Sequence, residues 1–276
     1  MAEGIRLAVW AVASRVISYF ARNETLAQFF RLPLAQQKAL FDGLAVPHPY
    51  VSLQNSGSEP IHRNWRYSWQ TKRQNFQLPC SVETRRHRAD WIARRVGIHS
   101  RIVVLGDDDY LSVELCMRGF RHLEVADCDP LVLGNIKKLT RAKPCYPLSF
   151  EGDFQDETFL KDRSPDLICI DPPYNSRWAR IFIRQAMRTA GRKQNVILMM
   201  MVNQKCFSDV DLQEINRELS EYGFVLKETV EGFNSYPMRG LSKFFLRMGI
   251  NILADTKVSG RLEFRSDLLV FERGSV

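Results

Sequence analysis

The chain has 276 residues, of which 45% are hydrophobic and 25% charged, a composition that excludes a wholly disordered protein. Its formal net charge of +8 is compatible with an anionic partner such as nucleic acid, but charge alone does not identify one. Residues 5–20 are apolar, but Arg6 and Arg15 interrupt them, so they fall short of the roughly 20 uninterrupted residues of a membrane span. We therefore expect no association with a membrane.

The first 45 residues are predicted to form two or three helices, which the Pro-His-Pro sequence at 47–49 brings to an end. Residues 51–60 have the composition of a linker. We therefore place a helical or accessory domain at 1–75 and a catalytic domain at 76–276. The helices could serve as a lid, as the face of a homodimer or as a cap that recognises the substrate.

Arginines crowd residues 63–95, and aromatic residues alternate with them. Such a stretch can bind the phosphates and bases of nucleic acid, or it can form a helix whose arginine stems cover apolar neighbours. We favour the second interpretation. Part of the stretch is predicted to be a helix at 82–96, with Ser81 as its N-cap and Gly97 as its stop.

From residue 101 onward, short apolar runs alternate with helical segments, a pattern typical of βαβ units in a parallel sheet. We predict strands at 102–105, 123–126, 167–170 and 195–202, and helices near 110–119, 130–139, 176–190 and 209–222. The runs at 225–231 and 267–272 are predicted to close the sheet as an antiparallel pair. The expected fold class is α/β: a Rossmann-like sheet, mostly parallel with an antiparallel edge, plus a small N-terminal helical domain.

The six cysteines show neither a Cys-x-x-Cys pair nor a zinc-finger spacing, so no metal site is expected. Several of them lie in apolar runs, where cysteine behaves as a small hydrophobic residue. This pattern predicts reduced cysteines in a cytoplasmic protein. The positions are Cys80, Cys116, Cys128, Cys145, Cys169 and Cys206.

Acidic residues occur in order along the predicted sheet, and ligands of open α/β sheets bind outside the carboxyl ends of the strands. We therefore expect these residues to surround one ligand. Gly106 would let the backbone approach it, and Asp107 or Asp108 would pair with a cationic tail. Asp127 would accept the ribose hydroxyls, and Asp153 would accept the adenine amino group. The absence of a Gly-x-Gly-x-x-Gly sequence argues against a dinucleotide.

The Asp-Pro-Pro-Tyr sequence at 171–174 follows a predicted strand and carries the predicted catalytic residues: Asp171, Pro172 and Tyr174. Prolines lack the N–H donor, so backbone carbonyls beside Asp171 can accept from an amino group. Tyr174 would stack on or flank the acceptor. Acceptors placed here would stabilise the positive charge that develops on an attacking nitrogen.

These features are similar to the class I methyltransferase fold, and the sequence at 171–174 resembles the motif of amino-methyltransferases. A closer resemblance is to the branched-chain polyamine synthases, the bis-aminopropylspermidine synthase family, in the segments 104–112 and 125–129. The Phe-Asn-Ser-Tyr sequence at 233–236 resembles that family's late substrate segment, which implies substrate contacts for Asn234 and Tyr236. The resemblance implies an aminopropyltransferase of polyamine biosynthesis that uses decarboxylated S-adenosylmethionine.

Two departures from that family bear on the substrate. Tyr174 stands where the family usually has an acidic residue, and residues 238–243 are basic where it has a late acidic stretch. A polyamine carries several positive charges and favours an acidic site. The resemblance therefore supports the fold and the cofactor class, S-adenosylmethionine or its decarboxylated form, more than it supports the substrate.

Three enzyme functions remain open. The first is alkyl transfer to a small-molecule amine, with aminopropyl transfer as the family default. The second is N-methylation of nucleic acid, with Tyr174 holding a flipped base and the stretch 63–95 holding phosphates. The third uses the aminocarboxypropyl arm of S-adenosylmethionine, by transfer or cyclisation, with Arg239 and Lys243 holding a carboxylate. A degenerate fold that only binds partners is disfavoured by the acids retained along the sheet.

Overall fold

The computed structural model describes residues 8–15, 17, 30–37, 79–143, 145–237 and 263–274. The chain divides into two compact units, Met1–Leu78 with Pro237–Phe264, and Pro79–Tyr236 with Arg265–Val276. The predicted linker at 51–60, the arginines at 63–73 and the basic segment at 238–243 lie outside the described residues.

The described part of the first unit is mostly helical and packs around a buried tryptophan. The indole N–H of Trp10 donates to Oε1 of Gln37 at 2.9 Å, and the Trp10 ring meets the ring of Phe30 edge-on at 6.2 Å. The amide of Gln37 donates in turn to the carbonyl of Leu32 at 2.7 Å. The polar side-chain atoms of Trp10 and Gln37 thus have hydrogen-bonding partners, as burial requires.

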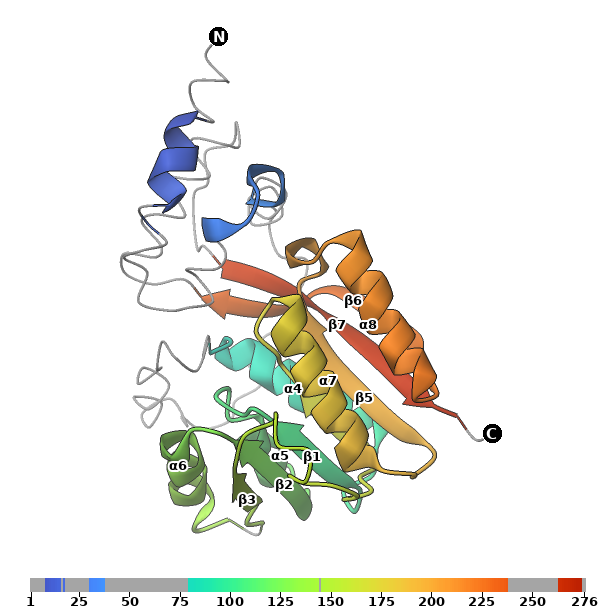
Figure 1. Ribbon diagram of the computed structural model, residues 1–276. Helices are drawn as coiled ribbons and strands as arrows, with labels where there is room; N and C mark the ends of the chain where they lie inside the picture. The colour runs from blue at the N-terminus through green and yellow to red at the C-terminus, as the bar shows by residue number, and fades with distance from the viewer. Residues whose placement is uncertain are drawn as a thin grey trace. The chain divides into compact units, whose positions relative to one another are not determined.

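The second unit is built on one seven-stranded sheet with the strand order β3-β2-β1-β4-β5-β7-β6 (Figure 1). The strands β1 to β5 pair in parallel, whereas β7 pairs with β5 in the antiparallel direction. Their bounds are β1 (Arg101–Leu105), β2 (His122–Asp127), β3 (Leu148–Glu151), β4 (Leu167–Ile170), β5 (Val196–Val202), β6 (Phe224–Pro237) and β7 (Glu263–Arg273).

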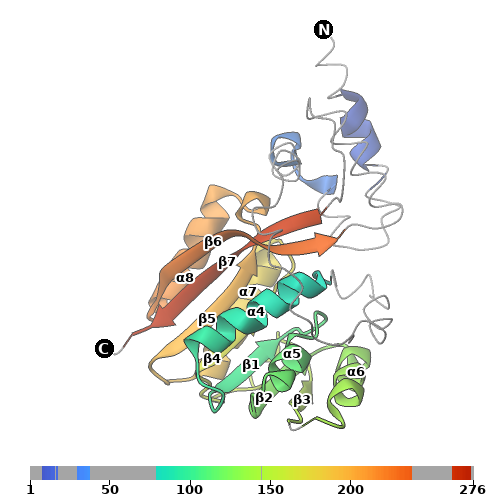
Figure 2. The ribbon, with the colours of Figure 1, turned by 180° about the vertical axis from the view of Figure 1, so that it is seen from behind.

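Helices cover both faces of this sheet. In the two opposite views, α4 and α5 lie on one face, and α7 and α8 lie on the other (Figure 1 and Figure 2). The helix α6 packs beside α5, β2 and β3. The bounds are α4 (Val82–Arg95), α5 (Leu111–Met117), α6 (Pro130–Thr140), α7 (Ser176–Ala190) and α8 (Asp209–Glu221), with a short 3-10 helix η4 (Gln204–Cys206).

The predicted elements of this unit are largely confirmed. The four central strands and the helices between them lie where the sequence places them, and the strand bounds agree within one residue. The side chain of Ser81 caps α4 by accepting from the amide of Thr84 at 3.0 Å, as predicted. The strand β3 was not predicted, because its short Leu-Ser-Phe-Glu sequence is half-exposed and lacks the apolar run of the other strands.

The register of the strands sets the position of the residues that follow them. Leu105 pairs with Ala126 of β2 and with Ile170 of β4, so these three strands end at the same level. Gly106, Asp127 and Asp171 therefore emerge side by side at the carboxyl edge of the sheet.

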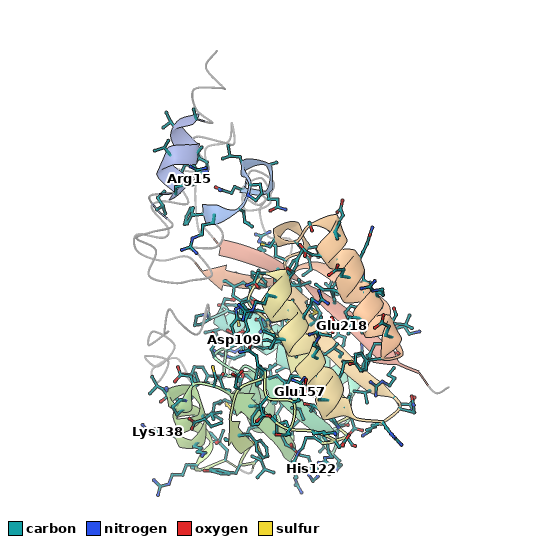
Figure 3. The ribbon with its side chains drawn as sticks, in the orientation of Figure 1. Arg15, Asp109, His122, Lys138, Glu157 and Glu218 are labelled. Atoms are coloured by element: carbon teal, nitrogen blue, oxygen red, sulfur yellow. A yellow bond between two sulfur atoms is a disulfide. The ribbon has the colours of Figure 1, made fainter. Side chains whose placement is uncertain are left out.

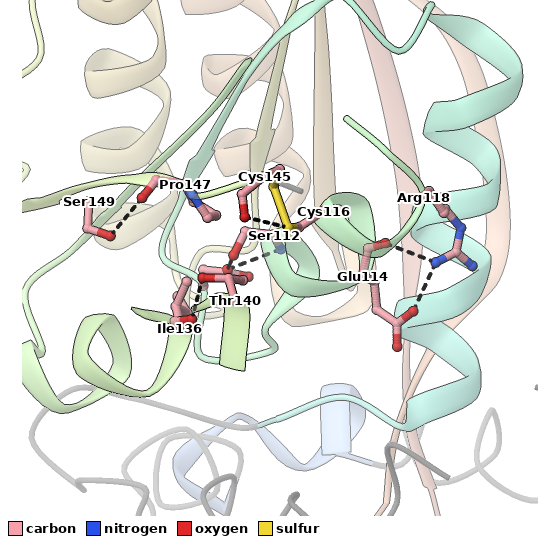
Figure 4. The surroundings of a disulfide bond; sticks show 10 residues. Ser112, Glu114, Cys116, Arg118, Ile136, Thr140, Cys145, Pro147 and Ser149 are labelled. Carbon is pink, nitrogen blue, oxygen red and sulfur yellow. Dashed lines mark hydrogen bonds and ion pairs between the residues drawn. A yellow bond between two sulfur atoms is a disulfide. The ribbon is translucent and has the colours of Figure 1, made fainter. Parts of the chain in front are cut away.

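A disulfide joins Cys116 of α5 to Cys145, which lies in the segment before β3 (Figure 4). The prediction that all six cysteines are reduced is therefore wrong for this pair. The two residues are 29 positions apart, and only the packing of α5 beside α6 and β2 brings their Cα atoms to 5.4 Å. The other cysteines are free: Cys80, Cys128, Cys169 and Cys206.

Within the residues that the structure describes, no helix is long and apolar enough to cross a membrane.

Candidate active site

The Gly-Asp-Asp-Asp sequence forms the turn between β1 and α5. Gly106 has a φ of +72°, and a Cβ atom there would approach the ring of Phe182 to 3.1 Å, so glycine suits this position for two reasons. Its amide donates to the carbonyl of Ala126 at 2.8 Å, which holds the turn against the end of β2. The acidic side chains that follow are thus fixed at the carboxyl edge, where Asp109 is seen in Figure 3.

Asp107 is fully buried and caps the start of α5. Its carboxylate accepts from the amides of Leu111 at 2.6 Å and Ser112 at 3.2 Å, and also from the hydroxyl of Ser112. Burial raises the pKa of Asp107 to about 7, although these hydrogen bonds lower it. Asp107 is one of the two residues predicted to pair with the cationic tail of the ligand. Its carboxylate instead accepts hydrogen bonds from the first turn of α5.

Asp108 is the half-buried neighbour, and no hydrogen bond to its carboxylate is found among the described residues. Burial, followed by the charges of Asp109, Asp127 and Asp171, raises the pKa of Asp108 well above its ordinary value. A cation that binds beside an unpaired carboxylate surrounded by other carboxylates strongly stabilises its ionised form. We call these four residues, together with Asp107, the acidic cluster.

Asp127 links the end of β2 to both adjoining turns. Its Oδ2 accepts from the amide of Asp107 at 3.0 Å, and its Oδ1 accepts from the amide of Asp129 at 2.8 Å. Burial raises the pKa of Asp127 to about 6. Each carboxylate oxygen can accept a further hydrogen bond, so the arrangement is compatible with the predicted ribose contact.

Asp153 differs from the other predicted cofactor residues because its side chain is exposed. Its Oδ1 accepts from the amide of Gln155 at 2.9 Å, which closes a local turn after β3. Its charge nevertheless reaches Cys128 at the end of β2, where burial first and then charges that include Asp153 raise the thiol pKa to about 11. The exposed carboxylate of Asp153 therefore lies near the end of β2 and is not part of the acidic cluster.

Asp171 takes part in a buried network with a guanidinium that the sequence did not single out. Arg88 of α4 is 1% exposed, and its Nη2 donates to Oδ2 of Asp171 at 2.8 Å. Its Nη1 donates to Oδ2 of Asp109 at 2.6 Å, so one cation serves two carboxylates. Burial raises the pKa of Asp171 to about 6, while the charge of Arg88 opposes that rise.

The residues predicted to bind the substrate from β6 complete this network. The hydroxyl of Tyr236 donates to Oδ2 of Asp171 at 2.7 Å and accepts from Nη2 of Arg88 at 2.8 Å. Oδ1 of Asn234 accepts from Nε of Arg88 at 2.7 Å, and its amide donates to Ser266 at 3.0 Å. Tyr236 is 1% exposed and Asn234 is fully buried, so both hold other side chains. The signal that could have identified Arg88 is its position on the buried face of a predicted helix.

The two remaining predicted catalytic residues are also buried. Pro172 directly follows Asp171 in the chain and is buried. The carbonyl of Pro173 accepts from the amide of Asn175 at 2.7 Å. Tyr174 is 8% exposed, and its ring meets the ring of Tyr236 edge-on at 6.0 Å. Its ring therefore packs within the protein, where it supports Tyr236.

Residues 68–259 match the profile of the branched-chain polyamine synthase A C-terminal domain, which covers more than half of the chain. No curated protein matches the chain in sequence.

Solved structures share the fold. A mutein of the branched-chain polyamine synthase from Thermus thermophilus matches with a TM-score of 0.64 and 15% identity, covering 98% of this chain and 88% of that one. The synthase itself gives 0.59 and 16%, covering 100% and 92%. Both are complexes with N4-aminopropylspermidine and 5′-methylthioadenosine. A Pyrococcus horikoshii protein provisionally described as an RNA methyltransferase gives 0.53 and 14%, covering 87% and 100%. The predicted Rossmann-like methyltransferase fold is confirmed.

Proposed function

Since this chain belongs to the branched-chain polyamine synthase family, we propose that it transfers an aminopropyl group from decarboxylated S-adenosylmethionine to an amine nitrogen of a polyamine. The family makes the chain an S-adenosylmethionine-type transferase and confirms the resemblance seen in its sequence. The group transferred and the acceptor are the proposal.

The observation that carries the proposal is the acidic cluster, and above all Asp108. Five carboxylates meet at the carboxyl edge of the sheet, and Asp108 has no hydrogen-bonding partner among the described residues. The buried cation Arg88 is shared between Asp109 and Asp171 and so offsets only part of this charge. Such a site attracts a polycation, even though the whole chain has a net charge of +8.

The same charges favour the decarboxylated form of the cofactor. S-adenosylmethionine ends in an amino group and a carboxylate, whereas the decarboxylated form ends in an amino group alone. An ammonium placed beside Asp108 would stabilise the ionised form of its carboxyl, whereas the neighbouring carboxylates would repel a carboxylate there. We assign the amino group to Asp108, the ribose hydroxyls to Asp127 and the adenine amino group to Asp153.

In the proposed reaction, the lone pair of the acceptor nitrogen attacks the propyl carbon bound to the sulfonium. The carbon–sulfur bond breaks, its electron pair stays on sulfur, and 5′-methylthioadenosine leaves. The nitrogen becomes positively charged and then loses a proton to solvent or to a carboxylate. Asp171 lies where its charge would stabilise this developing cation, with the backbone at Pro172 beside it.

A methyltransferase acting on nucleic acid receives less support. Tyr174 would have to stack on a flipped base, but its ring is buried and packed against Tyr236. The aminocarboxypropyl alternative needs basic residues for a carboxylate, and Arg239 and Lys243 lie outside the described residues. Both alternatives are outcomes of the experiment below.

The experiment that tests the proposal incubates the pure protein with spermidine and either S-adenosylmethionine or its decarboxylated form, followed by mass spectrometry. The expected result is 5′-methylthioadenosine and a spermidine that carries one added aminopropyl group, from the decarboxylated form only. A methylated product with S-adenosylhomocysteine, or an aminocarboxypropyl adduct, would replace the proposal with the corresponding alternative.

We propose that the protein is cytoplasmic and forms a homodimer. The four free cysteines fit a reducing compartment, but the disulfide between Cys116 and Cys145 fits one only in organisms whose intracellular proteins carry disulfides. Cell fractionation and the mass of the protein in solution would test the two points.

A further inference from the structure

Arg88 is the most completely buried cationic side chain among the described residues of the second unit. It lies on α4, yet its guanidinium contacts the turn after β1, the end of β4 and the strand β6. A buried guanidinium is costly unless each contact is well made. Four hydrogen bonds between 2.6 and 2.8 Å meet that requirement.

The contacts with Asp171 are not symmetric. Oδ2 accepts from Nη2 of Arg88 and from the hydroxyl of Tyr236, and these two donors are themselves hydrogen-bonded to each other. Oδ1 accepts no hydrogen bond among the described residues, and the side chain of Asp171 is 13% exposed. The carboxylate is thus held from one side, and its other oxygen is left for a ligand.

We infer that Arg88 is a positioning residue: with Tyr236 it fixes Oδ2 of Asp171 and keeps the carboxylate ionised, so that Oδ1 receives the acceptor amine. The identity of that amine rests on the proposed function. The arrangement at Asp171 stands on the geometry alone.

The hydrogen bonds to Oδ2 also determine which oxygen of Asp171 could take up the proton that the acceptor loses. Two donors already point at Oδ2, and a proton added to that oxygen would displace one of them. Protonation of Asp171 is therefore confined to Oδ1 and opposed by the charge of Arg88. The carboxylate acts as a fixed anion beside the nitrogen during attack.

Charged and titratable groups from several elements influence Asp171 and must be considered together. They are Arg88 on α4, Asp108 and Asp109 after β1, Tyr236 on β6, Tyr174 in the turn after β4, and the buried thiols Cys80 and Cys169. Within this set, Arg88 lowers the pKa of Asp171, whereas Asp109 raises it. Removal of Arg88 should therefore raise the pKa of Asp171.

The chain offers a matched control one turn earlier on the same helix. Arg85 is 3% exposed and donates from Nη1 to the backbone carbonyl of Asp109 at 2.8 Å, and it pairs with Glu114 at 3.5 Å. No hydrogen bond or ion pair between Arg85 and Asp171 is observed, so a variant here repeats the loss of a buried arginine without touching that carboxylate.

The test follows the side-chain carboxyl of Asp171 by carbon-13 NMR across pH, with the signal assigned from Asp171→Asn. In Arg88→Met the titration midpoint should rise by about 1–3 pH units, the effect expected for loss of an adjacent opposite charge. Arg88→Lys, which keeps the charge, and Tyr236→Phe, which keeps Arg88, should each shift it less. Arg85→Met should leave the midpoint unchanged.

The second readout is turnover with spermidine and the decarboxylated cofactor. Arg88→Met should lose about twofold to 100-fold in kcat at pH 7, the range given by a rise of about 1–3 units from a pKa of about 6, and the ratio of variant to parent activity should recover as pH rises. The KM for the cofactor should change little, and Arg88→Lys should restore part of the activity.

An unchanged Asp171 midpoint in folded Arg88→Met, or an equal shift in Arg85→Met, would overturn the inference. If Arg88→Met does not fold, unchanged midpoints in both Arg88→Lys and Tyr236→Phe would do the same. The titrations need no substrate. If the parent protein forms no aminopropyl product, the proposed function is rejected. The inference about Asp171 is then still decided by the NMR titrations.

Discussion

Asp171 is the residue on which the proposed chemistry depends most directly. Its removal should abolish most turnover and leave cofactor binding largely intact, because its carboxylate lies at the end of β4 and is not among the groups assigned to the nucleoside. We expect Asp171→Ala to lower kcat by about 10²–10³-fold, the usual cost of losing one preorganised electrostatic contact. Kinetics and calorimetry on the same preparation would separate the two effects.

Asp171→Asn is the companion to that variant, because it preserves the volume beside Arg88 and limits the cost of leaving a buried guanidinium unpaired. Full activity in either folded variant would remove Asp171 from the mechanism.

Asp127 should affect cofactor affinity. Loss of a charged acceptor for two hydroxyls costs about 1.5–3 kcal/mol, so Asp127→Ala should weaken binding of the decarboxylated cofactor by about 10–150-fold. Isothermal titration calorimetry measures this change. Asp156→Ala is a suitable control, since Asp156 is an exposed aspartate of the turn after β3 that holds Thr158. Unchanged affinity in Asp127→Ala would refute the ribose assignment.

At this scale, sequence reasoning located the residues that follow parallel strands and missed the residue that organises them. Asp127 and Asp171 could be predicted because strands of one parallel sheet end at one edge. Arg88 lies 83 positions from Asp171 and 148 from Tyr236, and no local pattern reports contacts of that range. The same long-range packing brings Asn234 into a hydrogen bond with Arg88, and Tyr236 into hydrogen bonds with Arg88 and Asp171.

Among the elements, α5 is fixed at both ends: its start contacts the acidic turn after β1, and its end is cross-linked to the segment before β3. Asp107 caps its start, and Cys116 near its end is bonded to Cys145 (Figure 4). A cross-link that closes a loop of this length stabilises the folded state by about 3 kcal/mol relative to the reduced chain. The disulfide should therefore contribute substantially to stability.

The Cys116→Ser, Cys145→Ser double variant should unfold at lower denaturant concentration than the parent, by an amount that corresponds to about 2–4 kcal/mol. Cys128→Ser, which changes an exposed free thiol, serves as the control and should leave the midpoint unchanged. Equal midpoints for the double variant and the parent would show that the disulfide adds nothing to stability in solution.

The elements themselves were more predictable than their connections. The strand β4, with its four buried residues Leu-Ile-Cys-Ile, stands out in any apolar profile. The strand β3 does not, since it is short and partly exposed, and it forms because β2 offers a backbone edge. The disulfide was missed for a related reason, because the pairing of two cysteines depends on which elements become neighbours.

At the scale of the whole molecule, net charge and local charge have opposite signs. The net charge of +8 and the basic segment at 238–243 do not by themselves favour a polyamine as substrate. In the second unit, however, many arginines are paired at the surface, as Arg180 is with Glu214 and Glu218, while the acidic cluster lies at the carboxyl edge of the sheet. A charge sum over the sequence cannot reveal this separation, and a substrate responds to the local field.

The acidic cluster also makes the stability of the unliganded protein depend on pH. Burial raises the pKa of Asp107 to about 7, and those of Asp127 and Asp171 to about 6, from an ordinary value of 3.8. Between about pH 4 and pH 7 the folded protein therefore binds more protons than the unfolded chain. These three carboxyls are therefore expected to lower the unfolding free energy as pH rises through this window.

Thermal unfolding at pH 5, 6 and 7.5 should accordingly show the highest Tm at pH 5. The aspartates with lowered pKa values act below their ordinary value of 3.8 and do not oppose this trend; they are Asp156, Asp166 and Asp211. Asp127→Asn should flatten the profile by removing one of the groups that titrate in the window. Spermidine should raise Tm more at pH 7.5 than at pH 5, since it binds the ionised cluster. A Tm that rises from pH 5 to pH 7.5 without ligand would mean that these carboxylates do not share one buried field, and the electrostatic basis for a polycationic substrate would be lost.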